Sequence, residues 1–275
     1  MMTSEYTYYF ITAFLYLMIG IRDWLSFNVM EVKAEHAQRR EWTTRLFLLV
    51  AWFTHVQLLQ QSVVANHQLD FSIGPSLSLL AATTVAMYWI ISFRHQMGLL
   101  RPVILFLAIP GVFAPLLFTE EKAVSYTGLA FKVHVMVSLM AYSLFGIATI
   151  HALFIRVLEK RILSKVLSRV NQWPSLVAMD AILFQMLWVG FAFLTVTLIS
   201  GVFFSESIFG IPLVFSHKVV FSILSWLIYA VLMIGRVKYG WRGRRAALFV
   251  ESGFVMLVLA YIGSKFVLEV LLHRS

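Results

Sequence analysis

The stretch Ile182–Phe204, ILFQMLWVGFAFLTVTLISGVFF, decides the fold, because it holds no charged residue and is long enough to cross a hydrocarbon core of about 30 Å. Similar apolar runs recur along the 275-residue chain, which is 60% hydrophobic and only 13% charged. Soluble domains usually carry about a quarter charged residues. We therefore expect an all-α, polytopic membrane helix bundle, with residues 1–275 forming a single integral membrane domain.

About eight runs are predicted to span the membrane. The first run is kept as a span because no basic residue precedes it and its first charge is Glu5, unlike a signal peptide. The predicted spans are Thr7–Ile21, Leu46–Val64, Pro75–Phe93, Pro102–Phe118, Leu129–Ile155, Ile182–Phe204, Val219–Gly235 and Leu248–Leu271.

Basic residues gather in alternate loops between these spans. Most of the 22 Lys and Arg residues follow the first, third, fifth and seventh spans; the exceptions are Lys122, Lys132, Lys218, Lys265 and Arg274. The positive-inside rule then places these four loops in the cytoplasm and both termini outside. The expected location is the bacterial inner membrane. The net charge of +9 by itself would suit a nucleic-acid partner, but the basic residues lie in loops between apolar runs, so we expect contact with membrane lipid and no nucleic acid.

Several chemistries are excluded by what the sequence lacks. Without cysteine, the chain has no disulfide, thiolate metal site, CxxCH haem-attachment motif or thiol–redox step of its own. No GxGxxG, GxxxxGK[ST], HExxH or GxSxG motif is present. The carboxylates nearest the spans, Asp180, Glu251 and Glu269, lie at span ends, where we expect them to snorkel or meet water. No catalytic residue is assigned, and ligand handling is favoured over bond chemistry.

Two of the eight histidines are predicted to lie at similar depth on the outer face. His134 lies one or two turns inside the outer end of the fifth span, and His217 caps the outer start of the seventh. Facing side chains on bundle helices build cofactor sites, and two neutral imidazoles suit a haem iron as axial ligands. Such binding should weaken as the pH falls through about 6.5. In the other interpretation, each histidine joins an interfacial hydrogen-bond network.

His55 lies in the middle of the second span, where an unpaired polar group is costly, so we expect it to point into the bundle. There it either hydrogen-bonds to another helix or ligates a cofactor at a second depth. Ser138 and Tyr142 follow His134 on one helix face. That polar stripe lines a cavity or packs against another helix.

Three stretches of the second half resemble a known family. They are VHVMVSLMAYSLFGIA at Val133–Ala148, PSLVAMDAILFQMLWVGFAFLTVTLISGVFF at Pro174–Phe204 and HKVVFSILSWLIYAVLMIGRVKYGWRGRRA at His217–Ala246. Over roughly residues 45–271 the chain resembles the CcsA/HemX-like cytochrome c assembly family, most closely its short bacterial members of the YpjD type. The resemblance implies haem handling, because larger relatives carry haem across the membrane and present it for attachment to apocytochrome c. His134 would match an outer-face haem-ligand histidine, and His55 an intramembrane one.

The chain departs from the larger relatives near its end. The segment SESIFGIPLVFSHK at Ser205–Lys218 lacks their tryptophan-rich WWD segment, and Lys265 stands where they have a histidine. We still expect an inner-membrane haem-binding protein of the cytochrome c assembly type, with apocytochrome c or other cytochrome c assembly proteins as partners. The alternatives are a non-haem accessory or regulatory subunit that partners another membrane protein, which the missing segment favours, and a small-solute transporter.

The topology predicts the outcome of reporter fusions. A fusion after Arg45 or Arg169 should report the cytoplasm, and a fusion at Ser275 should report the outside, because basic loops stay in the cytoplasm. Paired alkaline phosphatase and fluorescent protein fusions at these positions measure the orientation. A cytoplasmic C-terminus would contradict the predicted topology.

Overall fold

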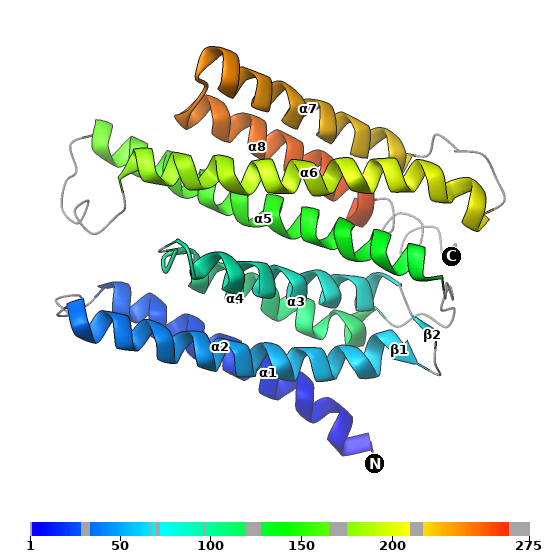
Figure 1. Cartoon of the computed structure of the whole chain (residues 1–275). Helices are drawn as coiled ribbons and strands as arrows, with labels where there is room; N and C mark the ends of the chain where they lie inside the picture. The colour runs from blue at the N-terminus through cyan, green and yellow to red at the C-terminus, as the bar shows by residue number, and fades with distance from the viewer. Residues whose placement is uncertain are drawn as a thin grey trace. The chain divides into compact units, whose positions relative to one another are not determined.

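The computed structural model describes residues 2–28, 34–65, 68–69, 72–95, 97–118, 128–164, 175–209 and 217–263. The chain divides into two compact units, residues 1–127 (unit 1) and residues 128–275 (unit 2). In the described part each unit consists of four α-helices. The only strands there are two in unit 1, of two residues each, which pair with one another (Figure 1). The all-α fold class is confirmed.

Unit 1 is a ring of four helices. They are α1 (Met2–Asn28), α2 (Ala34–Val63), α3 (Ile73–Ser92) and α4 (Leu100–Leu117). Helix α1 packs against α2 and α4, and α3 packs against the same two helices (Figure 1). Between α2 and α3, strand β1 (Val64–Ala65) pairs antiparallel with strand β2 (Gln68–Leu69).

Unit 2 repeats this order of packing. Its helices are α5 (Leu129–Leu163), α6 (Leu176–Phe209), α7 (His217–Tyr239) and α8 (Gly243–Val258), and α8 continues into a π-helical turn, Leu259–Gly263. Helix α5 packs against α6 and α8, and α7 packs against the same two. The short α7–α8 turn requires glycine, because Gly240 and Gly243 have φ values of 65° and 57°.

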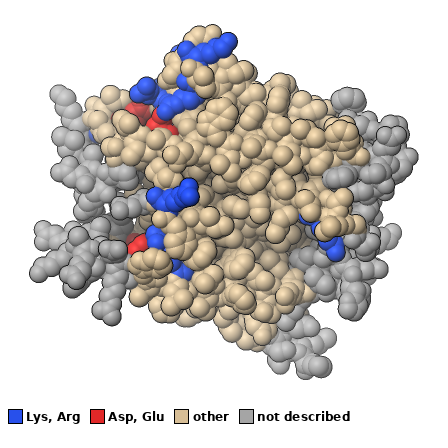
Figure 2. All heavy atoms as spheres, in the orientation of Figure 1, with Lys and Arg blue, Asp and Glu red and all other residues tan. Residues whose placement is uncertain are grey.

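The first seven predicted spans fall on α1 to α7, and the described part of the eighth, residues 248–263, falls on α8 and its π-helical turn; residues 264–271 of that span lie outside the described residues. Helices α3 to α7 are the ones whose described residues are long and apolar enough to cross a membrane. Large apolar side chains are exposed on the helix flanks, for example Phe10 at 64%, Leu117 at 70% and Val237 at 72%. In Figure 2 most of the visible charged residues gather on the left, and the rest of the coloured surface is largely uncharged. These surfaces are typical of a membrane bundle. The eight crossings and the outward termini stay predictions.

Two carboxylates of unit 2, Asp180 and Glu251, form ion pairs with arginines on neighbouring helices. Asp180 of α6 is 7% exposed and accepts from Arg236 of α7 at 2.7 Å and from the Gly243 N–H of α8 at 3.4 Å. Glu251 of α8 accepts from Arg156 of α5 at 2.6 Å. The expectation that these carboxylates snorkel or meet water was wrong for Asp180, which is buried, because a single sequence does not show which cation a carboxylate meets; the Glu251 side chain stays 24% exposed beside its ion pair. Glu269 lies outside the described residues.

Unit 1 has a more deeply buried charge at the corresponding end. Arg101 of α4 is 3% exposed and contacts one side chain from each of the other three helices. Its Nη1 donates to Asp23 of α1 at 2.8 Å, its Nη2 donates to Glu41 of α2, and its Nε donates to the Tyr88 hydroxyl of α3 at 3.2 Å. Every nitrogen of this guanidinium group therefore has a partner, as a buried charge requires.

The Arg101–Glu41 contact is an ion pair at neutral pH. Burial raises the pKa of the Glu41 carboxyl. The hydrogen bond and charge of Arg101, with the charges of Arg45 and Arg40, lower this pKa by more than burial raises it. The net result is a pKa below its ordinary value, so the carboxylate stays charged. Because Glu41 lies in the third turn of α2 and Arg101 is the second residue of α4, this pair joins two helices that are far apart in sequence.

Replacing Arg101 should weaken unit 1 strongly. Arg101→Gln removes the buried cation that Asp23 and Glu41 share and leaves them only the more exposed Arg22 and Arg45. Breaking a buried pair in this way costs about 3–5 kcal/mol. The melting temperature of the purified chain in detergent measures the loss. Arg94→Gln is the matched control, because Arg94 is exposed and should change stability by less than about 0.5 kcal/mol. Equal melting of both variants would show that the Arg101 cluster does not stabilise the unit.

Candidate histidine site

His134 lies five residues after the start of α5 and is half-buried. Its ring Nδ1 lies 2.7 Å from the Ser200 hydroxyl of α6. The same hydroxyl donates to the Thr197 carbonyl at 3.1 Å. The histidine is thus held between two helices through a serine that is itself tied to its own helix.

This chain of hydrogen bonds fits the Nδ1–H tautomer of His134. When the single proton of the Ser200 hydroxyl goes to the Thr197 carbonyl, the hydroxyl oxygen accepts from Nδ1–H of the imidazole. In that tautomer the lone pair on Nε2 is available to a ligand. Histidines that ligate metals have this arrangement, in which the second ring nitrogen donates to an oxygen that orients the ring. Ser200 was not predicted as part of the site.

His217 is the first residue of α7, and its side chain is exposed. Among the described side chains, no hydrogen bond or ion pair involves it. The described contacts do not join His217 to His134, and their shared site stays a prediction. The next residue, Lys218, is close enough for its charge to act on the His134 ring. Its ammonium group also lies 5.4 Å from the centroid of the Tyr261 ring.

The polar stripe after His134 packs against a helix. The Ser138 hydroxyl donates to the His134 carbonyl at 2.7 Å, and the Tyr142 hydroxyl donates to the Leu257 carbonyl of α8 at 3.1 Å. Tyr142 also meets Tyr261 edge-on, with ring centroids 6.0 Å apart. Of the two interpretations of this stripe, helix packing is the one found.

His55 of α2 is fully buried in unit 1. Its Nδ1 lies 3.1 Å from the Tyr16 hydroxyl of α1, and its Nε2 lies 3.0 Å from the Ser78 hydroxyl of α3. The expectation that it points into the bundle is confirmed. Both ring nitrogens are engaged by hydroxyl groups, so a metal would have to displace one of these bonds. In this conformation His55 joins three helices.

Comparison with known proteins bears on both sites. The profile of the family described as cytochrome C assembly protein matches residues 42–272. The chain belongs to the cytochrome c assembly protein family. The resemblance seen in the sequence is therefore confirmed, and the match includes His55, His134 and His217.

Two groups of relatives within the family are informative. The inner membrane protein YpjD of Escherichia coli strain K12 is 29% identical over 202 residues, which cover 73% of this chain and 74% of YpjD. The cytochrome c biogenesis protein CcsA of Prochlorococcus marinus strain MIT 9515 is 35% identical over 88 residues. That match covers 32% of this chain and 28% of CcsA, so the chain shares only a part of the CcsA protein.

The contacts of His55 predict its contribution to stability. His55→Leu leaves the buried hydroxyls of Tyr16 and Ser78 without a partner, so it should destabilise the chain by about 1–3 kcal/mol. Adding Tyr16→Phe should restore part of the loss, because one of the two stranded hydroxyls is then removed. Thermal unfolding in detergent measures both variants. His95→Leu, in the α3–α4 turn, is the control and should melt like the native chain. Unchanged melting of His55→Leu would contradict a structural role.

Proposed function

We propose that this protein is an inner-membrane haem-handling protein of the cytochrome c assembly type, which acts by ligation rather than by bond chemistry. The observation that carries the proposal is the His134–Ser200–Thr197 chain, which orients an imidazole with its Nε2 lone pair available. Family membership supports the same assignment, since the CcsA relatives are cytochrome c biogenesis proteins. Haem, apocytochrome c and other cytochrome c assembly proteins are the proposed partners.

The proposed topology has eight spans with both termini outside the cytoplasm. The YpjD relative is an inner membrane protein, and the basic loops orient the helices. Helices α5 and α7 then both begin at the outer end of unit 2. The charge of Lys218 acts on the ring of His134, which is expected if the starts of these two helices are neighbours. His217, one residue before Lys218, would then be at the same end as His134.

The residues at this end of unit 2 suit a haem. His134 and His217, from the starts of α5 and α7, would each hold the iron through a ring nitrogen. Lys218 would place a cation near the anionic propionates, and Tyr261 would add an aromatic surface beside it. When bound, the haem supplies a redox-active iron; the protein holds it, orients it and limits the access of water. His55 would act as an entry-route ligand only after its ring leaves Ser78 or Tyr16.

The second candidate is a non-haem accessory or regulatory subunit that binds another membrane protein. Two observations favour it: His55 is satisfied by hydroxyl groups, and the WWD segment of the larger relatives is missing before α7. In that case His134 would remain an interhelical hydrogen-bonding residue. Haem binding by the purified chain separates the two candidates.

Spectra of haem-loaded variants test the ligand assignment. The native chain should show a Soret band and a low-spin spectrum, His134→Ala should abolish the low-spin spectrum, and added imidazole should restore it. Ser200→Ala removes the group that orients the ring, so it should keep the low-spin spectrum but weaken haem affinity by about 10–100-fold. His95→Ala is the control and should behave like the native chain.

Each result bears on one of the candidates. An unaltered spectrum of His134→Ala would remove His134 from the site. A native chain that binds no added haem would favour the accessory subunit. Loss of binding in His134→Ala with native melting behaviour separates ligation from folding.

A further inference from the structure

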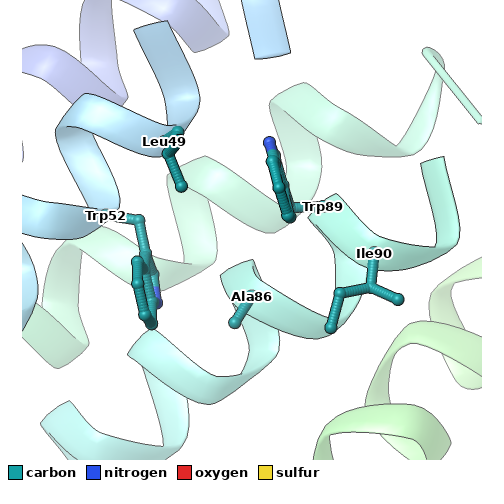
Figure 3. Close-up of a pocket in the computed structure, with 5 residues that line it drawn as sticks. All are labelled: Leu49, Trp52, Ala86, Trp89 and Ile90. Atoms are coloured by element: carbon teal, nitrogen blue, oxygen red, sulfur yellow. The ribbon is translucent and has the colours of Figure 1, made fainter. Parts of the chain in front are cut away.

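An apolar groove lies between α2 and α3 of unit 1, one helical turn from His55 and lined by neither His55 nor His134. It is lined by Leu49, Trp52, Ala86, Trp89 and Ile90 and has a volume of about 130 Å³ (Figure 3). The two indole rings stand on opposite sides of the space, and Ala86 forms its floor (Figure 3). Because Ala86 has a small side chain, the space between the Trp52 and Trp89 rings is left unfilled.

The walls of the groove are held in place by their polar ends. Trp52 donates its indole N–H to the Ala82 carbonyl at 3.0 Å, and Trp89 donates to the Arg45 carbonyl at 3.1 Å. Both N–H groups are thus used within the unit, and the ring faces are left for an apolar ligand. The groove is therefore preformed and does not depend on a ligand to order its walls.

The groove opens on an apolar surface. Val50, Phe53 and Ile90 beside it are 50%, 57% and 55% exposed. In a membrane bundle such side chains face lipid, so the occupant comes from the bilayer. An α-helix has a diameter of about 10–12 Å with its side chains and would cover the groove without entering it. A single hydrocarbon chain is narrow enough to enter.

Basic residues lie at one end of the groove. Arg45 precedes Leu49 by one turn of α2, and Arg94 follows Ile90 by one turn's length at the end of α3. Arg45 donates to the Ser92 carbonyl, which shows that these two ends meet. The Arg45 guanidinium group lies 4.7 Å from the Phe93 ring centroid, and the Phe93 and Trp89 ring centroids are 4.7 Å apart. Phe93 thus connects the Arg45 cation to the Trp89 wall of the groove.

The two arginines differ in their pairing. Arg45 lies 3.6 Å from the Glu41 carboxylate. Arg94 is exposed, and no ion pair among the described side chains includes it. One end of an apolar groove thus presents a cation to solvent, at the end of unit 1 that carries the Arg101 cluster. This combination fits an amphiphile with an anionic head and a hydrocarbon tail.

We propose that this groove binds one anionic phospholipid, with an acyl chain between Trp52 and Trp89 and its phosphate at Arg94 and Arg45. In the proposed topology the lipid comes from the cytoplasmic leaflet, where anionic headgroups attract basic residues. The site lies in unit 1 and does not depend on haem binding by His134. It would make the packing of α2 on α3 sensitive to the lipid composition of the membrane.

Native mass spectrometry of the full chain, released from vesicles of equal parts phosphatidylglycerol and phosphatidylcholine, tests the proposal. The native chain should retain one phosphatidylglycerol molecule and little phosphatidylcholine. Ala86→Phe fills the groove and should reduce retention at least tenfold; Arg94→Gln keeps the groove and should reduce the preference for phosphatidylglycerol several-fold. The matched controls are Ala178→Phe and Arg244→Gln, which change exposed residues of unit 2 and should behave like the native chain.

Other results would overturn the proposal. Equal retention of both lipids would show that the arginines do not select the headgroup. Undiminished retention by Ala86→Phe, in a chain that melts like the native one, would place the lipid elsewhere. If Ala86→Phe fails to fold, Ile90→Ala replaces it; this variant widens the groove and should also weaken retention, and unchanged retention would count against the site. Recovery of a bound protein subunit in place of lipid would also contradict the proposal.

Discussion

The packing of the four helices of unit 1 depends on the contacts of the buried Arg101 guanidinium group. An unpaired charge in a membrane bundle is costly, so this residue must find partners on other helices. Asp23, Glu41 and Tyr88 supply them from α1, α2 and α3, and the four helices are thereby joined at one end. Unit 2 solves the same problem with two separate ion pairs, Asp180–Arg236 and Glu251–Arg156, which again involve all four helices.

The ion pairs of unit 2 lie at the opposite end of the unit from His134. His134 and Arg156 lie on the same helix α5, separated by about 33 Å at a rise of 1.5 Å per residue. The ion pairs therefore hold the helices at a distance from the histidine, which is oriented locally by Ser200. The proposed ligand would then bind and leave without disturbing the contacts that hold the four helices together. In unit 1 the interior histidine, His55, is instead hydrogen-bonded to the Tyr16 and Ser78 hydroxyls.

The sequence predicted the helices well and the polar contacts poorly. Apolar runs such as Ile182–Phe204 mark a helix by length alone, so the described parts of the predicted spans fall on the observed helices. Pairing is a property of three-dimensional neighbours, so the partners of Asp180 and Arg101 carried no signal in one sequence. Ser200 was missed for the same reason, since a serine in an apolar helix has no characteristic spacing. His55 was predicted to point inward, but its two hydroxyl partners were not identified.

The haem content of the purified chain tests the central claim most directly. The full-length protein is extracted from its native membrane in mild detergent, purified, and assayed by pyridine haemochrome against protein concentration. The haem-handling assignment predicts a coloured protein, or a colourless one that takes up added haem in stoichiometric amount with a Soret band. A folded, monodisperse protein that is colourless and remains so in the presence of haem would contradict it.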